Sequence, residues 1–312
     1  MSRHPVLVAA ELQDLLDPGQ LDGLDVTWLP SDEPTPKGEW VALVPLLSRW
    51  VGGTELKHLP KLRIIANMAF GYNNIDLVAA ELRRVAVTNT PDVLTDATAD
   101  LTWALILACA RRLLAGVELI KGGQWSGWHP TLLLGMELHG KTLGLLGAGR
   151  IGRAVGQRGR AFGMRMLYST RTAKPAFEAE TGAIRVELGA LFRESDVLSL
   201  HVPAVPELQG IVNGENLSRM KPGAILINTS RGDLVREEAV AIALEEGRLG
   251  AAGLDVYAEE PAIHPRLLDA PRTVLLPHIA SATEEARRGM AGLALANVQA
   301  VLAGRPPLTP VY

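Results

Sequence analysis

The sequence predicts an α/β protein with two domains, each a doubly wound parallel sheet that carries helices on both faces. Two observations support this prediction. Short apolar runs alternate with helical patterns along the whole chain, which is typical of strand–helix–strand units. The length of 312 residues exceeds that of one typical domain, and a hydrophobic content of 47% is sufficient to form a core in each of two.

The first series of elements occupies the N-terminal part of the chain. Its apolar runs predict strands at residues 6–9, 26–29, 41–44, 62–66 and 85–88. A helical pattern at residues 77–84 separates the last two of these strands. This alternation predicts a complete parallel sheet in the N-terminal part of the chain.

The second series begins at Lys141. Its apolar runs predict strands at residues 142–146, 165–168, 197–200, 224–227, 253–256 and 274–276. Helical patterns follow at residues 150–162 and 284–302, and a long one at residues 97–114 connects the two series. The second sheet is therefore expected to be larger than the first.

The composition argues against several classes of protein. The 31 basic and 34 acidic residues give a net charge of −3, so no basic excess is available to offset the phosphates of a nucleic acid. Cys109 is the only cysteine, which excludes an internal disulfide and agrees with a cytoplasmic location. The longest apolar run, residues 101–110, is too short to span a membrane. No His, Cys or acidic cluster has metal-ligand spacing, so no metal is expected.

A glycine-rich segment follows the strand predicted at residues 142–146. It reads Gly147-Ala148-Gly149-Arg150-Ile151-Gly152 and fits the pattern G-x-G-x-x-G. The first glycine permits a tight turn, the second lets the backbone approach a pyrophosphate, and the third lets the helix pack closely on the strand. The N-terminus of the helix then presents N–H groups to the anion. The segment predicts a dinucleotide-binding site at Gly147, Gly149, Arg150, Ile151 and Gly152.

The end of the next predicted strand bears on the choice of dinucleotide. NAD-binding folds place Asp or Glu about 20 residues after the first glycine, where the carboxylate binds the ribose 2′-hydroxyl. Here the chain reads Ser169-Thr170-Arg171-Thr172, without an acid. Hydroxyls and a guanidinium would bind a 2′-phosphate that a carboxylate would repel. We expect NADP(H) to be preferred and NAD(H) to be possible, the alternative being that Arg171 is a solvated loop residue.

Further segments carry a resemblance to a known family. Those nearest the C-terminus read Asn228-Thr229-Ser230-Arg231-Gly232-Asp233, Gly253-Leu254-Asp255-Val256 with Glu259-Glu260-Pro261, and Pro277-His278-Ile279-Ala280-Ser281. With the glycine loop, they resemble the D-isomer-specific 2-hydroxyacid dehydrogenases. Residues 70–76 and 90–100 extend the resemblance over nearly the whole chain. The pattern Trp128-His129-Pro130 with Leu134-Gly135 is typical of the glyoxylate reductase branch.

The resemblance implies a domain organisation and a set of cofactor contacts. It implies a flavodoxin-like substrate domain of residues 1–96 and 282–312, a Rossmann cofactor domain of residues 97–281, and a homodimer. Beyond the glycine loop and residues 169–172, it places the cofactor near a further group of residues. These are Thr95, Val202, Pro203, Thr229, Ser230, Asp255, His278 and Ala280, with His201 at the edge of the same site.

Reduction of a 2-oxo acid needs a cation for the carboxylate, a proton for the carbonyl oxygen and a hydride donor. Arg231 can supply the cation as a two-pronged donor, and His278 can supply the proton because histidine titrates near neutrality. The resemblance places Glu260 beside His278, where a carboxylate would favour the imidazolium. Taken singly, each residue has a structural interpretation, but the joint pattern predicts Arg231, Glu260 and His278 as the catalytic set.

The predicted substrate is a small 2-oxo acid. The formate dehydrogenase branch of the family has Gln at the position of Glu260. The pair of Glu260 and His278 therefore indicates an oxo-acid or hydroxy-acid substrate. The branch resemblance implies glyoxylate or hydroxypyruvate, with the substrate carboxylate held by Arg231 and by the backbone N–H groups of Phe70 and Gly71, and with Leu47 near by. Two alternatives are a bulkier 2-oxo acid and a nucleotide-sensing scaffold similar to the corepressors of the family.

Overall fold

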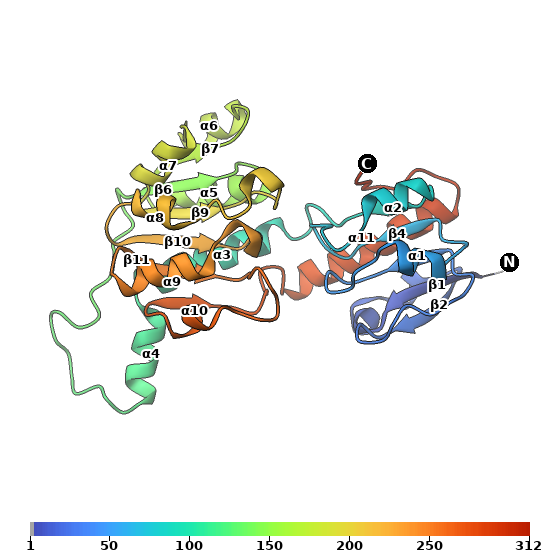
Figure 1. Cartoon of the computed structure of the whole chain (residues 1–312), viewed down its shortest axis with the longest axis horizontal. Helices are drawn as coiled ribbons and strands as arrows, with labels where there is room; N and C mark the ends of the chain where they lie inside the picture. The colour runs from blue at the N-terminus through green and yellow to red at the C-terminus, as the bar shows by residue number, and fades with distance from the viewer. Residues whose placement is uncertain (1–2) are drawn as a thin grey trace. The chain divides into compact units, whose positions relative to one another are not determined.

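The computed structural model describes residues 3–312, which form two compact units (Figure 1). Unit 1 combines Met1–Leu94 with Ala282–Tyr312, and unit 2 is Thr95–Ser281. The chain therefore leaves unit 1 to form unit 2 and returns to unit 1 for its last helix.

Unit 1 is built on a parallel sheet with the strand order β2-β1-β3-β4-β5. This is the flavodoxin-like order, with the first strand between the second and the third. The strands are β1 (His4–Ala9), β2 (Leu24–Leu29), β3 (Ala42–Val44), β4 (Ile64–Ala66) and β5 (Ala86–Thr88). The central residues of β1, β3, β4 and β5 are apolar and buried, as expected for strands covered on both faces, whereas only the two end residues of the edge strand β2 are buried.

Helices α1 (Gly53–His58), α2 (Leu77–Leu82) and α11 (Glu284–Leu302) cover the sheet of unit 1. Helix α2 begins at Asp76, whose carboxylate accepts the N–H of Ala79 at 2.9 Å. Helix α11 begins at Thr283, whose hydroxyl accepts the N–H of Ala286 at 3.1 Å. Because α11 packs against β3 and β4, the C-terminal segment completes the core of the N-terminal sheet.

Unit 2 contains a larger parallel sheet with the order β12-β11-β10-β9-β6-β7-β8. The order reverses direction at β6, which is the arrangement of dinucleotide-binding folds. The strands are β6 (Thr142–Leu146), β7 (Arg165–Ser169), β8 (Ile184–Arg185), β9 (Val197–Leu200), β10 (Ala224–Asn228), β11 (Leu249–Leu254) and β12 (Thr273–Leu275). The two sheets confirm the predicted fold class.

Helices pack on both faces of the sheet in unit 2. They are α3 (Thr95–Ala110), α4 (Leu113–Lys121), α5 (Arg150–Ala161), α6 (Pro175–Thr181), α7 (Leu188–Glu194), α8 (Gly214–Ser218), α9 (Glu237–Glu245) and α10 (Pro265–Asp269). Helix α3 packs against α5, β10 and β11, and its apolar side chains are largely buried. Helix α4 and the segment after it extend from the body of this unit (Figure 1).

Two predicted elements differ from the observed ones by more than two residues at one end. The helix predicted at residues 97–114 ends at Ala110, and Arg112, in a left-handed conformation with φ of 52°, separates α3 from α4. The strand predicted at residues 253–256 is β11, which begins at Leu249 and ends at Leu254. Asp255 and Val256 therefore belong to the loop after β11, at the edge of the sheet where the candidate site lies.

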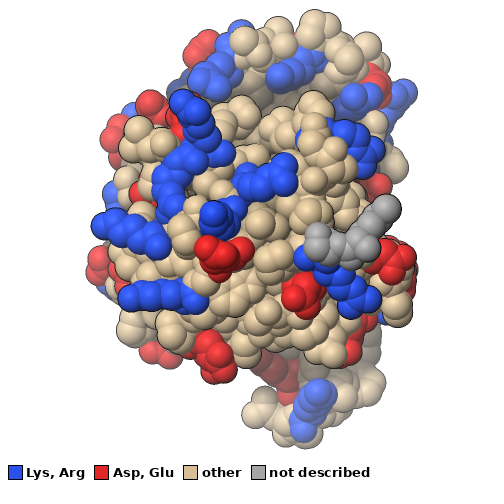
Figure 2. Space-filling view, turned by 90° about the vertical axis from the view of Figure 1, so that its right-hand side faces the viewer, with Lys and Arg blue, Asp and Glu red and all other residues tan. Residues whose placement is uncertain are grey.

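The charged residues of the described chain are mixed in sign. On the face in Figure 2, basic and acidic side chains both lie among uncharged ones, in keeping with the near balance of 31 and 34. Within residues 3–312, no helix combines the length and the hydropathy that a membrane crossing requires. Over the same range, no group of three or more His, Cys, Asp or Glu residues is placed to hold a metal ion.

Candidate active site

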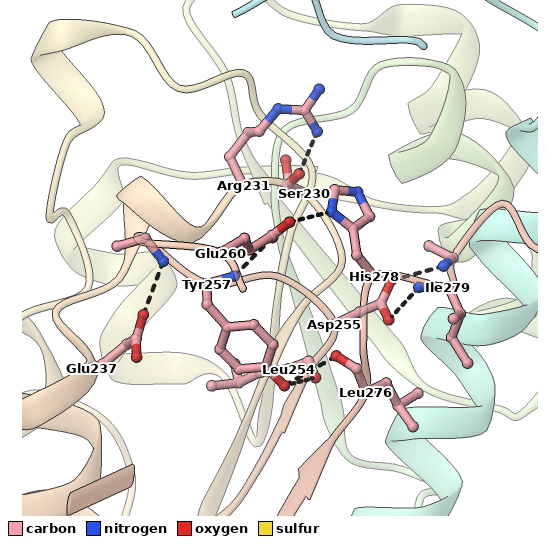
Figure 3. A network of polar contacts seen from close by, with 12 residues as sticks. Ser230, Arg231, Glu237, Leu254, Asp255, Tyr257, Glu260, Leu276, His278 and Ile279 are labelled. Atoms are coloured by element: carbon pink, nitrogen blue, oxygen red, sulfur yellow. Dashed lines mark hydrogen bonds and ion pairs between the residues drawn. The ribbon is translucent and has the colours of Figure 1, made fainter. Parts of the chain in front are cut away.

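The loops after β10, β11 and β12 carry the three predicted catalytic residues. Arg231 follows β10, Glu260 follows β11 and His278 follows β12. These strands are parallel neighbours in the sheet, so their carboxyl ends meet at one edge (Figure 3). The structure thus brings together three residues from three separate motifs.

His278 and Glu260 form a direct pair. Nδ1 of His278 lies 2.7 Å from Oε2 of Glu260, and both side chains are about one-third exposed, at 31% and 36%. In the part of the chain that the structure describes, the hydrogen bond to Glu260 uses Nδ1 and leaves Nε2 without a protein partner, so Nε2 is available to a ligand. This is the arrangement required of an imidazole that is oriented by a carboxylate and exchanges a proton with a substrate.

The backbone at His278 is left-handed, with φ of 56°. A non-glycine residue in this conformation is held there by its surroundings and is found disproportionately at functional sites. Asp255 supplies the restraint, because its two carboxylate oxygens accept the N–H groups of Ile279 at 2.8 Å and Ala280 at 2.7 Å (Figure 3).

Asp255 is fully buried. Burial raises its pKa above the ordinary range, and the two backbone N–H groups offset only part of that effect. The hydrogen bonds show that Asp255 holds the turn on which His278 sits. The sequence analysis assigned Asp255 to cofactor binding, and that role stays a prediction.

A backbone N–H group also holds the carboxylate of Glu260. Its Oε1 accepts the N–H of Tyr257 at 3.1 Å. Burial by itself would raise the pKa of Glu260, but its hydrogen bond to His278 and the nearby charges of His278 and Arg231 lower it overall. Glu260 is therefore ionised at neutral pH and stabilises a positive charge on His278.

Arg231 lies at the junction of β10 and the short helix η4 (Gly232–Leu234). Asn228 shapes this junction, since its amide donates to the carbonyl of Arg231 at 2.8 Å and its oxygen accepts the N–H of Ser230 at 3.0 Å. The guanidinium donates to the carbonyl of Ser230 at 2.6 Å. Burial lowers the pKa of Arg231, while the carboxylates of Glu260 and Asp233 act to raise it. A guanidinium stays charged in such a setting, which suits it to bind an anion.

The glycine loop lies between β6 and α5, where the strand order of unit 2 reverses. Gly147 has φ of 98°, and a Cβ there would lie 2.3 Å from the carbonyl oxygen of His201. A Cβ at Gly152 would lie 2.3 Å from the carbonyl oxygen of Gly147. The fold itself therefore requires glycine at these two positions.

Gly149 differs from its two neighbours in the motif. A Cβ at this position would meet no atom within 4 Å, and Gly149 is the N-cap of α5. The fold thus leaves open space beside the N–H groups of Arg150 and Ile151, where a pyrophosphate would bind. Among the described residues, no neighbouring atom requires glycine at position 149. A closely bound pyrophosphate would require it, so the residues present fit a dinucleotide.

The segment predicted to face the adenosine ribose is ordered by Arg185 in β8. Its guanidinium donates to the carbonyl of Thr170 at 3.1 and 2.9 Å and to that of Arg171 at 3.0 Å. The hydroxyl of Thr170 donates to the carbonyl of Thr172 at 2.6 Å. Ser169 ends β7, and the side chain of Arg171 is exposed. Arg185 adds a second positive charge to this segment.

The remaining predicted cofactor residues lie in the loops after β9, β10 and β12 and at the start of α3. The hydroxyl of Ser230 donates to the carbonyl of Val202 at 2.5 Å, and those of Thr229 and Thr102 lie 2.9 Å apart. His201 contacts the hydroxyl of Ser199 at 2.9 Å, and burial lowers the pKa of His201 to about 3, so it is neutral. Thr95 begins α3, Pro203 lies in the loop after β9, and Ala280 is buried.

The predicted substrate residues Leu47, Phe70 and Gly71 lie in unit 1, in the loops after β3 and β4. Two buried asparagines set these loops. Asn74 donates to the carbonyls of Leu46 at 3.2 Å and Arg49 at 3.0 Å, and Asn67 donates to that of Gly71 at 2.9 Å. Within residues 3–312, the N–H groups of Phe70 and Gly71 have no protein acceptor, so both can bind an anion.

Comparison with known proteins identifies the family. A model described as the NAD binding domain of D-isomer specific 2-hydroxyacid dehydrogenases matches residues 103–280. A glyoxylate reductase of Thermococcus litoralis is 49% identical over 270 residues, covering 85% of this chain and 82% of that protein. The chain belongs to the D-isomer specific 2-hydroxyacid dehydrogenase family.

Solved structures of the family have the same fold as this dehydrogenase. A Thermus thermophilus protein has a TM-score of 0.90 and 42% identity, covering 99% of this chain and all of that one. An NADPH-dependent glyoxylate/hydroxypyruvate reductase of Sinorhizobium meliloti, in complex with NADP and malonate, has a TM-score of 0.87 and 32% identity over 99% and 97% of the two chains.

Family membership confirms the resemblance and the oxidoreductase class predicted from the sequence. The family match, residues 103–280, lies within Thr95–Ser281, so unit 2 of this dehydrogenase contains the NAD binding domain. Three residues of this unit were not singled out by the sequence analysis: Arg185, Glu237 and Tyr257. Arg185 and Glu237 hydrogen-bond to backbone groups of loops distant in sequence, and Tyr257 to the carbonyls of Leu254 and Leu276, which no local motif signals.

Proposed function

We propose that this dehydrogenase reduces glyoxylate and hydroxypyruvate to the corresponding 2-hydroxy acids, and that it prefers NADPH as hydride donor. The contact of 2.7 Å between His278 and Glu260 carries the proposal, because it provides a proton donor for a carbonyl oxygen. The resemblance to the Thermococcus litoralis glyoxylate reductase and the Sinorhizobium meliloti reductase supports the substrate. In this proposal unit 1 is the substrate domain, and the predicted homodimer and cytoplasmic location stay predictions.

Arg231 and His278 have separate roles in the proposed reaction. Arg231 holds the substrate carboxylate by paired, charge-assisted hydrogen bonds. His278, oriented by its contact with Glu260, donates a proton to the carbonyl oxygen. A nicotinamide dinucleotide, which the glycine loop of Gly147, Gly149 and Gly152 would hold, would supply the hydride to the carbonyl carbon. In the reverse direction neutral His278 accepts the hydroxyl proton.

A panel of substrates tests the proposal. Glyoxylate, hydroxypyruvate, phenylpyruvate and 2-ketoisocaproate are each assayed with NADPH and with NADH. We expect the highest kcat/KM for the two small acids. A higher value for the branched or aromatic acids would support the alternative of a bulkier substrate. Absence of turnover with all four, together with tight nucleotide binding, would support a nucleotide-sensing scaffold.

The pair of Glu260 and His278 predicts a pH dependence. Reduction needs protonated His278, so the rate is high at low pH and falls as His278 loses its proton. Glu260→Gln keeps a hydrogen-bond acceptor but removes the negative charge that stabilises the imidazolium. The high-pH limb of kcat/KM for reduction should therefore move to lower pH.

The control for this measurement is Glu259→Gln. Glu259 is the neighbouring exposed residue, and it bridges to Ala262 through the backbone. Its substitution should leave the pH profile unchanged. If the profile of Glu260→Gln matches that of the wild type, Glu260 is not coupled to the proton donor.

The cofactor preference rests on charge at the segment of residues 169–172. A 2′-phosphate carries close to two negative charges, and Arg171 and Arg185 both bring positive charge to this segment. No carboxylate occupies residues 169–172, so nothing in this segment repels the phosphate. The segment therefore suits NADPH better than NADH.

Arg171→Ala should weaken NADPH binding by about 10- to 100-fold and leave NADH nearly unchanged, since one charge-assisted contact is lost. Ser169→Asp should invert the preference by adding both repulsion of the phosphate and an acceptor for the ribose. Dissociation constants from nucleotide fluorescence titrations provide the measurement. Arg165→Ala, at the opposite end of β7, is the matched control. Equal or tighter binding of NADH by the wild type would contradict the assignment.

A further inference from the structure

The loop that carries Glu260 is held at both ends by one carboxylate. Glu237, the first residue of α9, accepts the N–H of Ala258 at 2.9 Å through Oε1 and the N–H of His264 at 2.9 Å through Oε2. Figure 3 shows Glu237 pointing to the start of this loop. Between the two anchored residues, Ala262 donates to the carbonyl of Glu259 at 2.9 Å. Residues 258–264 thus form a closed loop whose two ends meet at Glu237.

The segment that leads to Glu237 also fixes the base of the loop. A Cβ at Gly232 would lie 1.8 Å from the carbonyl carbon of Tyr257 and 2.3 Å from the N of Ala258, so the two backbones are in direct contact. The hydroxyl of Tyr257 donates to the carbonyls of Leu254 and Leu276, at 3.2 and 3.0 Å. These contacts place the loop relative to β10, β11 and β12.

We propose that Glu237 is a positioning residue that sets the carboxylate of Glu260 against His278. The inference rests on the proposed function of the Glu260–His278 pair. Glu237 itself contacts neither partner of the pair and acts through the backbone of residues 258–264. Without it, the loop keeps its attachment at Tyr257 but loses both carboxylate contacts, and the contact of 2.7 Å between Glu260 and His278 loosens.

Two acceptor oxygens and a negative charge are both needed at Glu237. Each oxygen receives a backbone N–H group, and such charge-assisted bonds are the stronger kind. Glutamine offers one acceptor oxygen, and its NH₂ group would face an N–H donor. Glu237→Gln therefore releases one end of the loop without changing the size of the side chain. Glu238 provides the matched control, since it is the next residue of the same helix, is 63% exposed and has only a long ion pair of 3.9 Å with Arg266.

The experiment compares Glu237→Gln with Glu238→Gln in the full chain. We expect Glu237→Gln to lower kcat for glyoxylate reduction by about 10- to 100-fold, the effect of a small misplacement of a catalytic group. It should also move the high-pH limb of reduction to lower pH, while KM for NADPH changes less than about twofold. The charged groups that act on the pair, Arg231 and Asp255, are the same in all variants, as is Asp233, which acts on Arg231. Glu238→Gln should behave as the wild type does.

A second readout does not depend on turnover. The NMR titration midpoint of the His278 imidazole should fall in Glu237→Gln relative to the wild type, and amide exchange at Ala258 and His264 should become faster. If no 2-oxo acid is turned over by the wild type, the proposed function fails, and these measurements still decide the role of Glu237. Should Glu237→Gln not fold, Glu237→Asp retains the charge but is too short to reach both N–H groups, and is measured in its place. An unchanged midpoint with unchanged amide exchange would overturn the proposal.

Discussion

Replacement of His278 by alanine is expected to lower kcat for 2-oxo acid reduction by roughly 10²–10⁴-fold, the usual contribution of a general acid. His278 is the group oriented by Glu260 at 2.7 Å, and its turn is fixed by two hydrogen bonds to Asp255. Alanine removes the proton donor but leaves both backbone anchors, because Ile279 and Ala280 bind Asp255 through their own N–H groups. The loss should therefore appear in kcat and leave nucleotide affinity within a few-fold of the wild type.

The measurement is steady-state reduction of glyoxylate with NADPH, together with circular dichroism and a nucleotide titration to verify folding and binding. His4→Ala is the control, since His4 is an exposed residue at the start of β1 in the other unit. Turnover of the His278 variant within about tenfold of the wild type, with normal folding, would exclude His278 as the proton donor.

Elements with a clear pattern of buried apolar residues could be predicted from the sequence. Strand β6 is buried throughout and lies at the predicted residues, as does α11, which has a capping Thr283 and acidic residues in its first turn. Strand β11 was misplaced, because Gly250-Ala251-Ala252-Gly253 are small and the strand has no β-branched residue. Its position is set by pairing with β10 and β12 and not by local preference.

The break between α3 and α4 could not be predicted either. Residues 97–114 keep a helical pattern across the break, yet Arg112 adopts a left-handed conformation. Glycine or asparagine usually occupies such a position, so an arginine gives no signal of the break. The left-handed conformation costs an arginine only about 1–2 kcal/mol, and the surrounding structure can supply that free energy. Sequence periodicity therefore located this helical region but not the point at which it changes direction.

The candidate site shows the same division between local and long-range information. Arg231, Glu260 and His278 were predicted because each lies in a recognisable motif, and the sheet brings their loops together. Asp255, Glu237 and Arg185 orient these and other loops by accepting from or donating to backbone groups. Any residue can offer a backbone N–H or carbonyl, so such bonds leave no pattern in the sequence of the partner.

The substitution Arg231→Gln is expected to have a second large effect, on kcat/KM for the 2-oxo acid. Removing one partner of a buried, charge-assisted contact costs about 2–5 kcal/mol, which corresponds to about a 30- to 4000-fold loss. Lysine should not restore activity, because a point charge cannot reproduce the two-pronged contact with a carboxylate. Arg248→Gln, at an exposed ion pair with Glu246, is the control and should have no measurable effect.

Chemical rescue distinguishes loss of the substrate contact from loss of structure. Added guanidinium at low concentration should partly restore the reduction of glyoxylate by Arg231→Gln, because it can occupy the space of the missing group, and it should not affect Arg248→Gln. The removal of Arg231 also takes away one of the charges that lower the pKa of Glu260, so a small change in the pH profile should accompany the loss. If Arg231→Gln kept kcat/KM within about threefold of the wild type, Arg231 would be excluded as the residue that holds the substrate carboxylate.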